Sequence, residues 1–359
     1  MADSKQAPLD AEAAAKAAFA SVQDQPFPDD IFTAPELRWA VIGCGVIANQ
    51  MAQSLALAGR KLAGVANRTL SKAQSFAEQY GVEKVYETVE DLYADPDIDA
   101  VYITTPHNTH ITYLRAALAA GKHVLCEKAI TLNSAELDEA RAIADEHNVV
   151  LMDATTVLHM PLYQELRRRM DAGEFGHMNL AQLNFGSYKE YGDLTNRFYN
   201  RSLAGGAMLD IGVYALSVMR LFMASQPVEV VSLGNTCETG VDVAGGIVCR
   251  NAEQQLGVVS LTLHSKQPKR SVISFDKCYI EVNEYPRADH ATIVWTADGH
   301  REEVHAGTEA YALCYEMADL EKAVAGDDSK RELLGYASDV MDLMTKLRAD
   351  WGVVYPEEE

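Results

Sequence analysis

An acidic side chain and a phenol, Asp210 and Tyr214, stand four residues apart just behind the glycine pair Gly205-Gly206. Residues spaced i and i+4 share one face of a helix. Both side chains could therefore reach into one cleft, the carboxylate as hydrogen-bond acceptor and the phenol as proton donor. In the structural alternative, Asp210 caps a turn and Tyr214 is a half-buried core tyrosine.

A glycine turn near the start of the chain indicates a bound nucleotide that could take part in chemistry with this pair. The apolar run 37–42 breaks at a Gly-x-Gly-x-x-Ala turn and continues into the helix-like stretch 49–58. Gly43 would allow the turn, Gly45 would let the backbone approach a pyrophosphate, and Ala48 would let helix and strand pack closely. The phosphates would lie at the positive helix N-terminus. The residues that we assign to this cofactor site are Gly43, Cys44, Gly45, Val46 and Ile47.

The end of the next predicted strand indicates which dinucleotide binds. Strand 62–66 is followed by Asn67 and Arg68, about where the ribose-binding residue belongs. An acidic residue there would accept from the 2′-hydroxyl and repel a 2′-phosphate, whereas the Arg68 guanidinium can grip that phosphate. The sequence therefore favours NADP, with NAD as the alternative. In the structural alternative, Arg68 is a solvated charge at a strand end.

Two polar segments follow later strands, at the edge where open α/β sheets bind their ligands. They are Thr105, Pro106, His107 and His110 after strand 100–104, and Glu127 and Lys128 after strand 123–126. Burying a Glu-Lys pair is costly unless both charges are satisfied. We therefore assign both segments to the cofactor site, although either histidine could instead be structural.

Composition limits the class of protein. The chain has 359 residues, more than a usual single domain, and a formal charge of −21, which argues against nucleic acid or anionic membranes as partners. No stretch has the length of uncharged apolar residues that a membrane span needs. The start of the chain lacks the basic and apolar parts of a signal peptide, so we predict a cytoplasmic protein. The six cysteines form no metal-ligand spacing, and no metal is predicted.

The order of predicted elements indicates two domains behind an N-terminal extension, 1–36, which includes a short helix at 11–20. Strands alternate with helices over 37–157, the pattern of a doubly wound parallel Rossmann domain. Over 158–359, consecutive apolar runs predict an α+β domain with a large, mostly antiparallel open sheet. Its predicted strands are 228–233, 243–249, 257–263, 272–275, 278–282 and 292–295, and its closing helices are 311–325 and 332–351.

Together these motifs resemble the glucose-fructose oxidoreductase, inositol dehydrogenase and MocA family over about residues 37–355. The resemblance rests on the glycine turn at 43–48, the Thr-Pro-His segment with His110, Cys-Glu-Lys-Ala-Ile at 126–130 and Gly-Gly-Ala-Met-Leu-Asp-Ile-Gly-Val-Tyr at 205–214. Ala129 replaces the proline of the family's Glu-Lys-Pro signature. Tyr214, where inositol-type enzymes carry histidine, and the ending 351–356 are similar to the dimeric dihydrodiol dehydrogenase and NADP-dependent xylose dehydrogenase branch.

The resemblance implies an NAD(P)-dependent oxidoreductase that moves a hydride between NADP and a carbinol or carbonyl carbon of a sugar, polyol or cyclic diol. It implies Lys128, Tyr214 and Asp210 as catalytic residues that also contact the substrate. Arg197, in a predicted loop just before the glycine pair, is a further candidate for substrate binding. Tyr214 would exchange the proton, while Lys128 would favour the phenolate or hold the substrate oxygen itself. Which of the two is the acid stays open. Arg197 would read a substrate hydroxyl or carboxylate, or simply anchor its loop.

Other activities are known on this fold. A redox-assisted glycosidase or lyase would keep its nicotinamide tightly bound, and a ligand-sensing protein would keep the fold without the chemistry. The presence of Lys128, Asp210 and Tyr214 together argues against a sensor. An open sheet with one uncovered apolar face predicts a homodimer through the second domain, or a homotetramer.

Overall fold

The computed structural model describes residues 17–22 and 25–359. Residues 17–22 are helical, whereas most of the helix predicted at 11–20 lies outside the described residues. The chain divides into two compact units. Unit 1 runs up to Thr131 and adds Ala135–Ala154 and Ala310–Gly335, and unit 2 contains Leu132–Ser134, Thr155–Glu309 and Tyr336–Glu359.

Unit 1 contains, in its described part, a six-stranded parallel sheet of order β3-β2-β1-β4-β5-β6. Its strands are β1 (Trp39–Ile42), β2 (Gly64–Ala66), β3 (Lys84–Tyr86), β4 (Ala100–Ile103), β5 (His123–Cys126) and β6 (Leu151–Asp153). This is the predicted doubly wound Rossmann arrangement. The strand order reverses between β1 and β4, so a ligand crevice is expected at their carboxyl ends.

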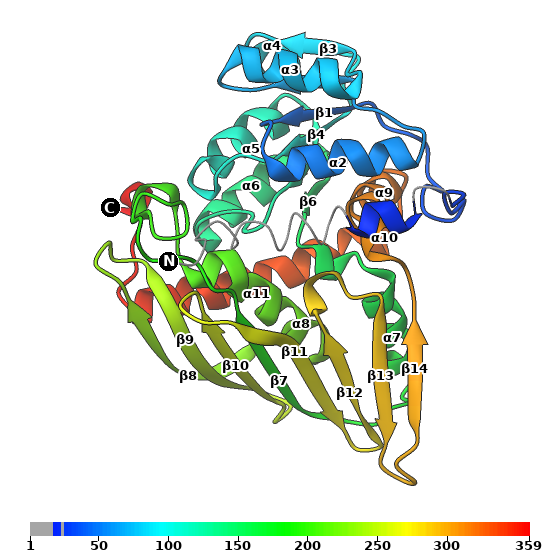
Figure 1. Ribbon diagram of the computed structural model, residues 1–359, viewed down its shortest axis with the longest axis vertical. Helices are drawn as coiled ribbons and strands as arrows, with labels where there is room; N and C mark the ends of the chain where they lie inside the picture. The colour runs from blue at the N-terminus through cyan, green and yellow to red at the C-terminus, as the bar shows by residue number, and fades with distance from the viewer. Residues whose placement is uncertain (1–16, 23–24) are drawn as a thin grey trace, which may run out of the picture. The chain divides into compact units, whose positions relative to one another are not determined.

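Helices lie along this sheet in unit 1 (Figure 1). They are α2 (Val46–Leu57), α3 (Leu70–Tyr80), α4 (Val89–Ala94), α5 (His110–Ala119), α6 (Ser134–Glu146) and α9 (Ala312–Val324), together with α10 (Asp328–Arg331), which packs on α9. Helix α9 comes from late in the chain, yet Leu313, Met317 and Leu320 join the same core as Val41 and Leu55. The predicted domains 37–157 and 158–359 place this helix in the second domain, whereas it packs in unit 1. Each such buried side chain contributes about 1.5–3 kcal/mol of hydrophobic stabilisation, which is why the segment packs on unit 1.

Unit 2 is built on an eight-stranded sheet, formed by residues that the structure describes throughout, in the order β14-β13-β12-β11-β7-β10-β9-β8. Only the β7–β10 pair is parallel among these described strands, so the sheet is mostly antiparallel, as predicted. The strands are β7 (Met178–Gly186), β8 (Pro227–Thr236), β9 (Asp242–Asn251), β10 (Leu256–Thr262), β11 (Gln267–Phe275), β12 (Cys278–Asn283), β13 (His290–Trp295) and β14 (Arg301–His305).

The sequence patterns indicated neither the central strand β7 nor the edge strand β14. In β7, Asn179, Gln182 and Asn184 interrupt the apolar residues, and asparagine has low β-propensity. The strand forms because Leu183 and Phe185 are buried on the covered face of the sheet while Gln182 and Asn184 stand on the other face. Tertiary burial therefore decides its conformation.

Helices cover one face of the large sheet. They are α7 (Pro161–Asp171), the π-helix η4 (Met208–Gly212) that leads into α8 (Val213–Phe222), and α11 (Leu333–Asp350). Helix α8 packs against β7, β10 and β11. The approach is close: a Cβ at Gly257 of β10 would lie 2.3 Å from the Met219 sulfur.

One helical stretch within the described residues, Arg201–Phe222, is long and apolar enough to cross a membrane. Its most apolar window is 78% buried inside the protein, as the core helix of a soluble protein would be.

Candidate functional site

The glycine turn after β1 has the geometry that a bound pyrophosphate needs. Gly43 has a φ of +103°, and a Cβ there would lie 2.7 Å from the Thr104 hydroxyl oxygen. Gly45 begins α2 without any side-chain cap, and a Cβ on it would meet nothing within 4 Å. The first-turn N–H groups of α2 therefore have no side-chain acceptor at the cap, as an anion-binding helix N-terminus requires. These residues fit the phosphates of a dinucleotide.

The side chains at the glycine turn have no reactive group that is available at neutral pH. Val46, the first residue of α2, is 65% exposed. Burial raises the pKa of the Cys44 thiol to about 11, so it stays protonated at neutral pH. We therefore see no role for Cys44 as a nucleophile.

The predicted ribose-binding residues lie at the carboxyl end of β2, beside β1. The Asn67 side-chain amide donates to the Thr69 carbonyl oxygen at 3.0 Å, which orders the turn. Arg68 is exposed, and no ion pair of its guanidinium occurs within the part of the chain that the structure describes. It is thus accessible to an incoming phosphate.

His110 joins the two loops that follow β4 and β5. The ring is fully buried, with Nδ1 2.9 Å from the Ala129 carbonyl oxygen and Nε2 2.8 Å from that of Thr105. Burial lowers its pKa, and a neutral ring can donate to only one of the two carbonyls. Its nitrogen atoms face the backbone, so its part in the predicted cofactor site is to hold these loops. His107, half-buried, lies with its ring 5.8 Å from that of His110.

Glu127 and Lys128 are both half-buried at the carboxyl end of β5. The Tyr102 hydroxyl donates to one carboxylate oxygen of Glu127, and the Lys128 amide donates to the other at 3.3 Å. The peptide bond between Lys128 and Ala129 is cis. Tyr102 was not identified from the sequence, because it stands inside an apolar strand and nothing in that run distinguishes it from a core residue.

All the predicted cofactor residues therefore lie at one edge of the unit 1 sheet. They follow the carboxyl ends of β1, β2, β4 and β5. In an open α/β sheet this edge is the ligand-binding edge.

The residues predicted for acid–base chemistry in unit 2 lie where a π-helix meets α8. Asp210 belongs to η4, and Tyr214 stands in the first turn of α8. Tyr214 is half-buried, with its ring 6.1 Å from that of Phe185 on β7. The sequence predicted an ordinary helical turn here. The wider π-turn is a geometry that often marks functional sites.

The glycine pair before this turn has a packing reason. A Cβ at Gly205 would lie 2.6 Å from the Arg197 carbonyl oxygen and 2.8 Å from that of Phe198. Gly206 has a φ of +127°, and its Cβ would lie 2.3 Å from Asp242 Oδ1. The two glycines thus let a loop and a buried carboxylate pack directly against the backbone that leads to Asp210.

Arg197 and Asp210, both predicted to bind substrate, form an ion pair. The Arg197 guanidinium lies 3.3 Å from Asp210 Oδ1 and 4.6 Å from the centre of the Phe198 ring. Lys189 approaches the same ring at 4.2 Å. The Arg197 side chain is 62% exposed, so its ion pair contributes little to stability and is easily rearranged by a ligand.

Asp242, at the start of β9, is a fully buried carboxylate that no motif indicated. Its Oδ2 accepts from the Met208 amide at 2.6 Å, and its Oδ1 has no hydrogen-bond partner among the described residues. Burial raises the pKa of Asp242 to about 6. No sequence signal could have found it, because the contact joins positions 34 residues apart.

Asp242→Asn should change how stability depends on pH. The pKa is about 6 in the folded state against an ordinary 3.8, so the folded protein binds the extra proton between these values. The free energy of unfolding in the wild type therefore falls as pH rises from about 4 to 6. The variant should lack this pH-dependent loss, which amounts to about 3 kcal/mol between pH 4 and pH 7. Urea unfolding from pH 4 to 8 measures it, with the exposed Asp138→Asn as control. Parallel curves for the wild type and Asp242→Asn would contradict the prediction.

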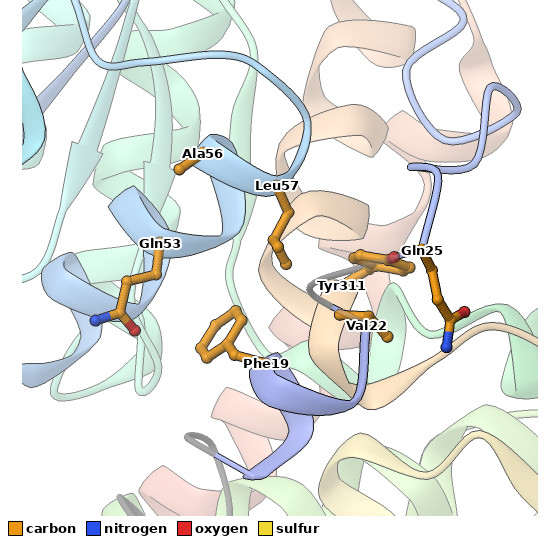
Figure 2. Close-up of a pocket in the computed structure, with 7 residues that line it drawn as sticks. All are labelled: Phe19, Val22, Gln25, Gln53, Ala56, Leu57 and Tyr311. Atoms are coloured by element: carbon orange, nitrogen blue, oxygen red, sulfur yellow. The ribbon is translucent and has the colours of Figure 1, made fainter.

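A separate pocket of about 390 Å³ lies in unit 1, beside the C-terminal half of α2 (Figure 2). The side chains that line it are Phe19, Val22, Gln25, Gln53, Ala56, Leu57 and Tyr311. None of the predicted cofactor or catalytic residues is among them. The described residues also contain no group of three or more histidine, cysteine, aspartate or glutamate side chains that could hold a metal ion.

Comparison with known proteins identifies a family over most of the chain. Residues 37–155 match the oxidoreductase family with an NAD-binding Rossmann fold, and residues 163–281 match the GFO/IDH/MocA C-terminal domain. The trans-1,2-dihydrobenzene-1,2-diol dehydrogenase of Xenopus laevis is 28% identical over 89% of this chain and 99% of its own length. The enzyme of that name from Xenopus tropicalis is 31% identical over 68% of this chain and 74% of its own length.

Solved structures share the fold. Levoglucosan dehydrogenase, in complex with NADH and levoglucosan, has a TM-score of 0.76 at 20% identity, covering 88% of this chain and 97% of that one. A 3-ketoreductase from Actinomadura kijaniata, in complex with NADP and TDP-benzene, has a TM-score of 0.75 at 24% identity, covering 88% and 98%.

Proposed function

Because the chain belongs to the GFO/IDH/MocA family of NAD(P)-dependent oxidoreductases, we propose that it transfers a hydride between NADP and a carbinol or carbonyl carbon of a sugar, polyol or cyclic diol. The main support for this proposal is that the predicted cofactor residues lie together at the carboxyl edge of the unit 1 sheet. The names of the relatives, trans-1,2-dihydrobenzene-1,2-diol dehydrogenases, support a diol as substrate. We also propose a cytoplasmic location.

The residues of unit 1 would hold the cofactor. Gly43, Gly45 and the first turn of α2 would bind the pyrophosphate through backbone N–H groups. Asn67 and Arg68 would bind the adenosine ribose and its 2′-phosphate. Bound NADP supplies the acceptor or donor of the hydride. The loops tied together by His110 would line the reactive end of this site with Thr105, Pro106, His107, Glu127 and Lys128.

The remaining residues would handle the proton and orient the substrate. Tyr214 would exchange a proton with the reacting oxygen, and Lys128 would hold that oxygen or stabilise the phenolate. Asp210 would accept a hydrogen bond from a neighbouring hydroxyl. Arg197, 3.3 Å from Asp210, would donate to the same hydroxyl or the next one. A donor and an acceptor this close suit a vicinal diol.

Absorbance at 340 nm, with NADP and then NAD against a panel of aldoses, polyols and cyclic diols, tests the proposal. Turnover with one of these classes would support it. No turnover by protein that retains its nicotinamide through purification would instead favour the redox-assisted or sensing alternatives.

Arg68→Asp should reverse the choice of cofactor. The exposed guanidinium would be replaced by a carboxylate that repels the 2′-phosphate and accepts from a 2′-hydroxyl. We expect the KM for NADP to rise about tenfold or more while the KM for NAD changes little, from initial rates with each cofactor. Equal changes in both would show that Arg68 does not read the phosphate.

We propose that two copies pair through the uncovered face of the large sheet, with a tetramer as a further assembly. Apolar side chains gather at one end of it: Val231 and Leu233 of β8 are 75% and 84% exposed, and Val248 of β9 and Leu256 of β10 are 47% and 40% exposed. Val231 and Val248 are direct cross-strand partners. A contiguous apolar patch on a sheet is a usual protein–protein interface.

Leu233→Glu should therefore convert the dimer to monomer, because a carboxylate would be buried without a partner in the interface. Light scattering at micromolar concentration measures the mass. Val354→Glu, at a 41% exposed valine outside the strands, is the control and should leave the mass unchanged. A wild-type monomer at this concentration would overturn the proposed dimer.

A further inference from the structure

The C-terminal segment of unit 2 is held to the rest of the unit by a buried arginine. Arg348, at the end of α11, has a side chain only 2% exposed. Its guanidinium makes two hydrogen bonds to the Glu358 carboxylate, at 2.8 and 2.9 Å, and a third to the Leu132 carbonyl oxygen at 2.5 Å. The last residues of the chain are thus fixed against the segment around Leu132.

The segment held in this way lies a few residues after a predicted catalytic residue. Leu132 and Asn133 follow Lys128 by four and five positions. The Asn133 side-chain amide donates to Glu358 at 2.9 Å, beside the contact of Arg348 with Leu132. Glu358 also accepts from the Tyr355 backbone amide at 3.0 Å, which closes the last turn of the chain.

The same segment also reaches the turn before Asp210. Tyr355 is fully buried, and its hydroxyl donates to the Gly205 carbonyl oxygen at 2.7 Å. A Cβ at Gly206 would lie 3.4 Å from this hydroxyl. The Arg348 guanidinium lies 4.6 Å from the centre of the Tyr355 ring, so one cation supports both contacts.

We propose that Arg348, Tyr355 and Glu358 form a C-terminal clasp, a set of positioning residues for the proposed hydride transfer. The clasp holds the chain just after Lys128 and the turn just before Asp210 in a single buried network. It rests on the proposed function, because it assigns the three residues to the geometry of that site. A displacement of about 1 Å at a reacting group can lower a rate about 100-fold, so residues without any contact to substrate can control kcat.

Tyr355→Phe tests the clasp, and the chain offers a matched control. Tyr163 is also buried, and its hydroxyl donates at 2.7 Å to a backbone carbonyl, that of Tyr285, elsewhere in unit 2. Each variant removes one buried hydrogen bond, so both should lose similar stability. Only Tyr355→Phe should lower kcat, about tenfold or more, with the KM for NADP unchanged. Equal kcat values in the two variants would overturn the clasp.

Amide hydrogen exchange gives a reading that needs no substrate. The amides of Gly206, Met208 and Asp210 are bonded to Phe198, Asp242 and Gly206 in the turn that Tyr355 holds. Their exchange should accelerate about tenfold in Tyr355→Phe and stay unchanged in Tyr163→Phe. Glu358→Gln, which keeps the shape but weakens the bonds to Arg348, should accelerate exchange at 132–134. Unchanged exchange at both segments would overturn the clasp. If exchange accelerates in the variants as expected but the wild type has no hydride-transfer activity, only the proposed function is refuted.

Discussion

Tyr214→Phe is expected to lower kcat by about 100-fold or more, the scale of losing a general acid or base. The change removes only the hydroxyl, and the ring keeps its packing 6.1 Å from Phe185. Stability and NADP affinity should therefore be preserved. Initial rates at saturating cofactor measure the effect. Tyr279→Phe, at a 37% exposed tyrosine on β12, is the matched control and should keep full activity.

The pH profile of the same variants decides how Lys128 and Tyr214 share the proton. If Tyr214 is the acid, Lys128→Gln should keep measurable turnover and shift the pH dependence of kcat, because Lys128 is proposed to favour the phenolate. If Lys128 is the acid, its variant should lose as much activity as Tyr214→Phe or more. Full activity in Tyr214→Phe would leave Tyr214 as a core tyrosine and refute its catalytic role.

Gly206→Ala is expected to destabilise unit 2 by about 3 kcal/mol or more. A backbone φ of +127° costs an alanine about 1–3 kcal/mol, and its Cβ would lie 2.3 Å from Asp242 Oδ1. Thermal unfolding should show a loss of about 6–12 °C in Tm for a domain of this size. Gly335→Ala is the control, because a Cβ at Gly335 meets nothing within 4 Å and its φ is ordinary.

A double variant separates the two causes of that loss. If the clash with Asp242 contributes, Gly206→Ala should cost less in an Asp242→Ala background, with a coupling free energy of about 1 kcal/mol or more. An unchanged cost would assign the whole effect to backbone strain. A Gly206→Ala protein as stable as the wild type would refute the packing reason for the glycine pair.

The local patterns of unit 1 were sufficient to predict most of its elements. Strand His123–Cys126 has the predicted bounds, and the glycine turn lies between β1 and α2 as expected. Strand–turn–helix units are encoded by neighbouring residues, since hydrophobic periodicity and glycine positions act over a few positions. Parallel pairing of these units then follows from their alternation.

Elements that depend on distant partners could not be predicted in this way. Strand β7 is rich in asparagine and glutamine and becomes the centre of the unit 2 sheet only because β10 and β11 pair with it. Helix α9 packs with α2 although more than 250 residues separate them. The sequence of neither segment indicates which distant element will pack against its apolar face.

The same distinction between local patterns and distant contacts applies to the candidate site. The sequence by itself determined the residue types and spacings: the glycine turn, the strand-end segments with Lys128, and the Asp210–Tyr214 pair. Only the tertiary structure decided that His110 joins two loops, that Tyr102 donates to Glu127, that Arg197 meets Asp210, and that Asp242 and Tyr355 support the glycine pair. Chemistry needs residue types that local patterns reveal. Position is set by buried contacts between segments far apart in the chain, and these contacts form only when the whole core excludes water.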